Sequence, residues 1–110
     1  MLNDQELIRI LNGCSRNNRK AQQKLYHHFF NLVMAITFAD ETGYDNAVSL
    51  ANDSFLIVFR ELLHYTDKKT TVLSFSAKLS YITMQVCLKR KENTKILSKT
   101  FCQAEPEMVL

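Results

Sequence analysis

The sequence predicts an all-α fold, a compact bundle of about four helices. The 110 residues include only two glycines and one proline, whereas an all-β domain uses many more turn residues. Apolar residues also recur at helical spacing along most of the chain, with polar breaks between the periodic segments. We therefore expect helices at about residues 3–12, 18–38, 44–65 and 72–91.

The first two helices have recognisable starts. Asn3 can cap the first helix, with Glu6 three residues later as in a capping box, and Gly13 is expected to end it. After a polar connector, Asn17 or Asn18 can cap the second helix. The apolar face of this second helix comprises Ala21, Leu25, Phe29, Leu32, Val33 and Ile36.

The third and fourth helices each follow a polar segment, one around Gly43 and the other at residues 66–71. In each helix, apolar residues recur at spacings of three and four, which is the pattern of a buried helix face. Together with the second helix, these stripes predict a core of Leu25, Phe29, Leu32, Ile36, Ala51, Phe55, Phe59, Leu62, Phe75, Leu79, Ile82 and Val86.

The outer side of the third helix is unusual for a solvated surface. Opposite the core stripe lie Ser49, Asn52, Asp53, Leu56, Arg60 and Leu63. Leucines rimmed by polar side chains are typical of docking surfaces, although single exposed leucines are common in soluble proteins. From these residues alone, a docking surface and an ordinary exposed face are equally acceptable interpretations.

Positive charge is concentrated in the second part of the chain. Residues 1–67 carry six Lys/Arg and eight Asp/Glu, a net charge of −2, and residues 68–110 carry eight and three, a net charge of +5. On the fourth helix, one flank beside the core stripe combines cations, an amide and an aromatic ring, namely Lys78, Tyr81, Gln85 and Lys89. Such a flank favours contact with a polyanion, and the alternative is a solvated lysine-rich surface.

The sequence offers no catalytic, cofactor or metal site. Two glycines cannot form a phosphate-binding loop, and the adjacent His27 and His28 point in different directions on a helix, so they cannot chelate one metal together. Three widely spaced cysteines, Cys14, Cys87 and Cys102, favour reduced thiols over a disulfide framework. We therefore expect a protein that is not an enzyme and needs no cofactor.

Length and hydropathy predict a single soluble domain. A chain of 110 residues suits one modest core, and no apolar run approaches the length of a membrane span. The acidic, polar N-terminus is unlike a secretory signal. We expect a cytoplasmic protein without membrane contact, in which residues 1–95 form the helical domain and residues 96–110 form a tail or the start of a linker.

Three segments of the chain match, in the same order along the sequence, three sequence motifs of a known protein family. These positions are Glu6, Leu7, Ile8, Gly13, Ala21, Leu25 and Tyr26 in the first segment, Ala47, Leu50, Asp53, Phe55 and Leu56 in the second, and Phe75, Leu79 and Ile82 in the third. This succession resembles region 2, the core-binding domain, of bacterial sigma factors. It looks most like the extracytoplasmic-function group of the sigma-70 family, and the resemblance covers about residues 3–95.

The resemblance implies a division of labour between two helices. In the family, the helix with the AEDLVQE motif binds the clamp helices of the largest subunit of RNA polymerase, which assigns polymerase binding to Asn52, Asp53, Leu56 and Arg60. The next helix and the loop before it recognise and melt the promoter −10 element, which assigns DNA binding to Lys78, Tyr81, Gln85 and Lys89. An anti-sigma factor is a further candidate partner.

The chain departs from the family pattern at several of these positions. Val48 and Ser49 replace acidic residues of the docking motif, Lys78 and Ser80 replace aromatic residues of the DNA-reading motif, and Lys89 replaces an aspartate. A second hypothesis therefore stays open, a degenerate all-α interaction module that binds polymerase or a regulator without reading DNA.

Overall fold

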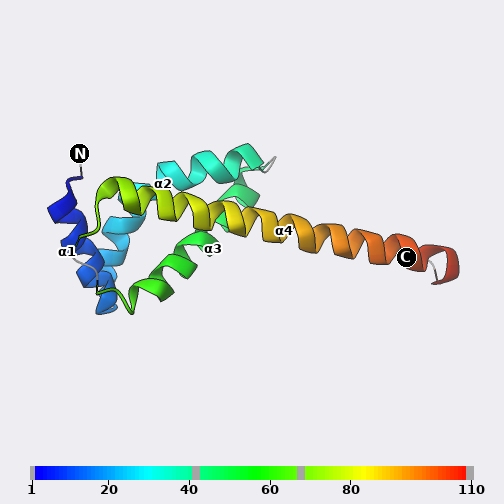
Figure 1. The fold of residues 1–110 in the computed structure, drawn as a ribbon. Helices are drawn as coiled ribbons and strands as arrows, with labels where there is room; N and C mark the ends of the chain where they lie inside the picture. The colour runs from blue at the N-terminus through cyan, green and yellow to red at the C-terminus, as the bar shows by residue number, and fades with distance from the viewer. Residues whose placement is uncertain (1, 41–42, 67–68, 109–110) are drawn as a thin grey trace.

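The protein is a bundle of four α-helices in a computed structural model that describes residues 2–40, 43–66 and 69–108, with side chains as far as Glu92 (Figure 1). No strand occurs in these ranges, so the all-α prediction is confirmed. In chain order, the helices are α1 (Asp4–Ser15), α2 (Arg19–Asp40), α3 (Tyr44–Leu62) and α4 (Val72–Met108).

Asparagine side chains cap the first two helices, as the sequence predicts. The backbone N–H of Glu6 donates to Asn3 Oδ1 at 2.8 Å, and Asn3 Nδ2 donates to the Glu6 carboxylate at 3.0 Å. At the start of α2, the backbone N–H of Ala21 donates to Asn18 Oδ1 at 3.1 Å. Each cap satisfies a backbone donor that has no partner within the first turn of the helix.

Gly13 does not end α1, and that prediction was wrong. The helix continues to Ser15, and the chain turns at Asn17, which has a positive φ of 58°; asparagine is one of the few residues that adopt this conformation readily. Gly13 instead allows a close approach between helices, because a Cβ atom at this position would lie 2.5 Å from Ala21 Cβ.

α4 is much longer than the sequence predicts. Its expected end was near residue 91, but the helix continues to Met108, so residues 96–108 continue it. Figure 1 shows this last part of α4 extending beyond the other helices, and only the end of the expected tail, residues 109–110, lies outside the described residues.

Most of the predicted core is buried, and the third helix has the predicted orientation. Phe55 exposes 1% of its surface and its neighbour Leu56 exposes 56%. Of the other predicted core residues, those that are only partly buried are Leu32, Ile36, Phe59, Ile82 and Val86. Buried positions outside the predicted core are Leu7, Ile10, Leu11, Cys14, Val33, Ala47, Leu50, Val58 and Cys87.

Three hydroxyl residues, Thr37, Ser54 and Thr83, are also fully buried. Their hydroxyls donate to carbonyls one turn earlier in the same helix; for example, Thr83 Oγ1 lies 2.8 Å from the carbonyl oxygen of Leu79 and Ser54 Oγ lies 2.9 Å from that of Leu50. These hydrogen bonds satisfy the hydroxyls without a partner from another helix, so each residue packs as a small apolar one does.

Candidate functional site

The outer face of α3 is defined as Ser49, Asn52, Asp53, Leu56 and Arg60, with Leu63 at the C-cap of the helix. These residues are exposed apart from Asp53, which is half-buried. Its two leucines, Leu56 and Leu63, expose 56% and 46% of their surfaces, and the neighbouring Ile57 exposes 37%. The predicted polymerase-binding residues therefore lie on one side of one helix. This side combines apolar surface with an amide, a carboxylate and a guanidinium.

Asn52 is held in place from α2. The Tyr26 hydroxyl donates to Asn52 Oδ1 at 3.0 Å, and the Tyr26 ring packs against Phe55 with a centroid distance of 4.7 Å. Burial is the main cause that raises the pKa of Tyr26, with the nearby Tyr44 a smaller one, so the hydroxyl stays protonated and able to donate. The amide on the outer face is thus oriented by the packing of the core.

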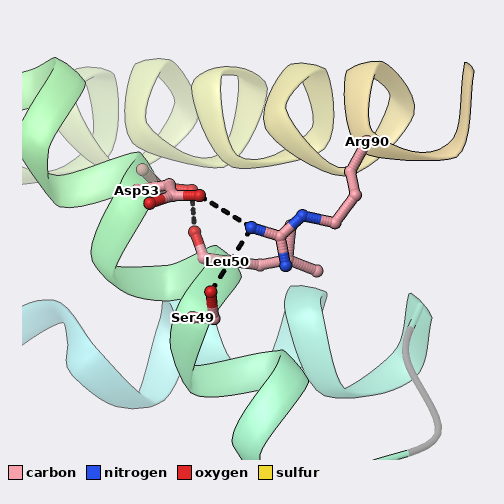
Figure 2. Close-up of polar contacts among 5 residues, drawn as sticks. Ser49, Leu50, Asp53 and Arg90 are labelled. Atoms are coloured by element: carbon pink, nitrogen blue, oxygen red, sulfur yellow. Dashed lines mark hydrogen bonds and ion pairs between the residues drawn. The ribbon is translucent and has the colours of Figure 1, made fainter. Parts of the chain in front are cut away.

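Asp53 is held from the opposite side, by α4. Arg90 Nη2 donates to Asp53 Oδ2 at 2.8 Å and to Ser49 Oγ at 3.3 Å, and Figure 2 shows the guanidinium reaching from α4 to both side chains. Sequence reasoning missed Arg90. The signal was available, because Arg90 follows Leu79 by eleven residues and Val86 by four, and therefore continues the inward-facing stripe of α4.

The predicted DNA-binding residues on α4, Lys78, Tyr81, Gln85 and Lys89, are all exposed. Tyr81 exposes 61% of its surface, so it is not a core residue. Lys78 Nζ lies 4.0 Å from a carboxylate oxygen of Glu61 on α3, and both side chains are more than half exposed. This flank can therefore present two cations, an amide and an aromatic ring to a ligand in solvent.

A pocket of about 390 Å³ lies beside this flank, between the end of α3, the connection to α4 and the start of α4. Its lining includes Phe75 and Leu79 from the core, with polar groups from Tyr65, Ser74 and Lys78. Sequence reasoning did not find the pocket, because its lining combines residues of α1, α3, α4 and the connection between α3 and α4, and no periodic pattern marks such a place.

The residues that the structure describes contain no group of three His, Cys, Asp or Glu side chains able to hold a metal ion. Within the same residues, no helix is long and apolar enough to cross a membrane. Cys14 is fully buried, and burial raises the pKa of its thiol to about 11. This thiol is therefore neutral and unreactive near pH 7.

Comparisons of the chain with protein-family models, with curated proteins and with solved structures give no match. The class that the structure itself defines is a small all-α bundle with a mixed apolar and polar face on α3 and a cationic, aromatic flank on α4.

Proposed function

We propose that this chain is a sigma-factor region 2 domain of the extracytoplasmic-function type, which binds bacterial core RNA polymerase and recognises and melts the promoter −10 element. The observation that carries the proposal is the exposure of apolar and polar residues together on the outer face of α3, next to the cationic flank of α4. The order of the motif positions supports the same assignment. The domain then acts in the bacterial cytoplasm, without catalysis of its own, and an anti-sigma factor remains a candidate regulator.

In this proposal, the outer face of α3 binds the clamp helices of the largest polymerase subunit. Leu56 supplies apolar area at the centre of the contact, and Asn52, Asp53 and Arg60 supply polar groups around it. An apolar centre within a polar rim is the usual arrangement of a protein interface. Since the Tyr26 hydroxyl already orients Asn52, little side-chain entropy of this residue is lost on docking.

The α4 flank then binds the DNA strand that is displaced when the −10 element melts. Lys78 and Lys89 can pair with phosphates, and the exposed ring of Tyr81 can stack on a base. Gln85 offers a donor and an acceptor to a base edge. The pocket beside Lys78, at about 390 Å³, has room for a base that has left the stack, and its mixed lining offers apolar contact and hydrogen bonds.

A second candidate function is an all-α interaction module that binds polymerase or a regulator without reading DNA. Two observations favour it. Lys78 Nζ lies 4.0 Å from a carboxylate oxygen of Glu61, and Lys78 and Ser80 occupy positions where the family has aromatic residues. Loss of those rings removes stacking surface from the DNA-reading helix. The two candidates share the docking face and differ only in the role of the α4 flank.

Leu56→Asp tests the docking face. We expect at least about a tenfold loss of affinity for core polymerase, because the substitution places a charge in the apolar centre of the contact. The matched control is Leu73→Asp, the same substitution at a leucine on α4 that is 81% exposed, and it should bind normally. The measurement is a fluorescence titration of the labelled chain with core polymerase, and equal affinities for the two variants would contradict the docking proposal.

Tyr81→Ala and Lys78→Glu test the α4 flank. In the complex with core polymerase, each variant should bind a single-stranded −10 oligonucleotide about fivefold or more weakly. Tyr81→Ala removes stacking worth ~1–3 kcal/mol per base, and Lys78→Glu replaces a phosphate-binding cation with an anion. Lys78→Glu should also reduce the dependence of binding on salt, since each phosphate contact releases counterions. Tyr44→Ala is the matched control, because Tyr44 on α3 is also 61% exposed. DNA binding that is unchanged in both flank variants, with polymerase binding intact, would favour the second candidate function.

A further inference from the structure

The contact of Arg90 with α3 occupies Asp53, one of the polar groups around Leu56 on the proposed docking face. Arg90 Nη2 lies 2.8 Å from Asp53 Oδ2 and 3.3 Å from Ser49 Oγ. Ser49 and Asp53 are four residues apart, so their side chains are neighbours on the surface of α3. A carboxylate and a hydroxyl in this arrangement form a small acceptor site for a guanidinium, and the chain fills that site with its own arginine (Figure 2).

This pair lies at the surface and can be exchanged. The side chains of Arg90 and Asp53 are 35% and 49% exposed, and ion pairs in such positions contribute little to stability because water and salt compete with them. If another cation pairs with Asp53 in place of Arg90, the long side chain of Arg90 can carry the released guanidinium into solvent. A docked partner can therefore take the place of Arg90 at a small energetic cost.

The bundle has a second attachment at the same level of α4, so Arg90 is not needed to hold the helix. Lys91 Nζ lies 2.7 Å from Asp40 Oδ1 on α2. Cys87, one turn before Lys91 on α4, is also buried. Lys91 and Arg90 thus tie adjacent positions of α4 to two different helices, and the Arg90 contact covers a group on the outer face of α3.

We propose that Arg90 competes with the docking partner for Asp53 and Ser49. When α3 docks, a basic side chain of the partner replaces Arg90 at these two residues. This inference rests on the proposed docking of core polymerase through α3. The site reveals the chemistry that it accepts, because its occupant in the free chain is a guanidinium. Arg90 therefore sets the affinity of docking, and it favours partners that carry a cation at this point of the contact.

Arg90→Gln is the central test, with core polymerase titrated against the labelled full chain. The variant should bind about two- to fivefold more tightly, because the partner no longer displaces an internal cation and Asp53 exposes its full charge. Lys91→Gln is the matched control; it removes the adjacent cation of α4 and leaves the Arg90 contact in place, so its affinity should equal that of the unmodified chain. Helical circular dichroism and a thermal melt of each variant report whether the fold is intact.

Two further variants separate failure of this inference from failure of the proposed function. Asp53→Asn should weaken docking, and Arg90→Gln in the Asp53→Asn background should have no additional effect, because the competed carboxylate is then absent. If Asp53→Asn weakens docking but Arg90→Gln leaves it unchanged or weakens it, Arg90 is not a competitor and the docking proposal stands. If Asp53→Asn leaves docking unchanged, Asp53 is not part of the contact and the Arg90 inference is overturned with it.

Discussion

Replacing Phe55 by alanine is expected to lower the free energy of unfolding by about 3–5 kcal/mol. Phe55 exposes only 1% of its surface, and its ring packs against Tyr26 and Phe59 at centroid distances of 4.7 and 6.0 Å. Alanine leaves a cavity that these rings can fill only in part. Because Tyr26 also donates to Asn52, the substitution is expected to loosen one polar group of the outer face of α3.

The measurement is urea denaturation followed by circular dichroism at the helical band. Leu56→Ala is the matched control, since Leu56 adjoins Phe55 in the sequence but is 56% exposed, and its free energy of unfolding should change by less than about 0.5 kcal/mol. Similar losses for the two variants would mean that α3 is rotated relative to the core. In that case Leu56 could not be at the centre of a docking surface.

The orientation of α3 could be predicted from the sequence because burial and exposure alternate strongly along this helix. Phe55 and Leu62 point inward and Leu56 and Leu63 point outward, as the periodicity indicates. A helix with one wide apolar face can pack in only one rotation without exposing that face. The residues of the proposed docking face follow from the rotation of α3, and those of the α4 flank follow in the same way from the core stripe of α4.

The contacts between α3 and α4 at the candidate site could not be predicted from the periodicity of either helix. The Arg90 contact with Asp53 and the pocket beside Lys78 join residues from different helices, and their geometry depends on how α3 and α4 cross. Periodicity places each residue on a face of its own helix but does not fix the distance to the next helix. The length of α4 was missed for another reason, because the apolar periodicity that predicts this helix is weaker after residue 91 than before it.

The role of Gly13 was predicted wrongly because a glycine in a sequence can indicate either the end of a helix or a close approach between two helices. Glycine is common just after the last turn of a helix, and a serine and several polar residues follow it here. In the structure, the glycine lies inside α1, where the missing side chain makes room for Ala21 of α2. This interpretation leads to a prediction with a definite sign.

Gly13→Ala is expected to destabilise the protein by about 1–3 kcal/mol, although alanine is the better helix former by ~1 kcal/mol. The added Cβ would lie 2.5 Å from Ala21 Cβ, well inside the ordinary contact distance between carbon atoms. Neither methyl group can rotate away, so α1 and α2 must separate. The same urea denaturation measures the effect.

Two matched variants decide whether the close approach is the cause. Gly43→Ala places the new Cβ no closer than 3.8 Å to its nearest neighbour, Asn46 Nδ2, so it should change the free energy of unfolding by only a few tenths of a kcal/mol, as expected at the cap of α3. Ala21→Gly combined with Gly13→Ala restores the space between the helices, and should be more stable than the sum of the two single changes indicates. A stabilised Gly13→Ala variant would show that α1 and α2 do not meet at this point, and that Gly13 serves only the local end of the helix.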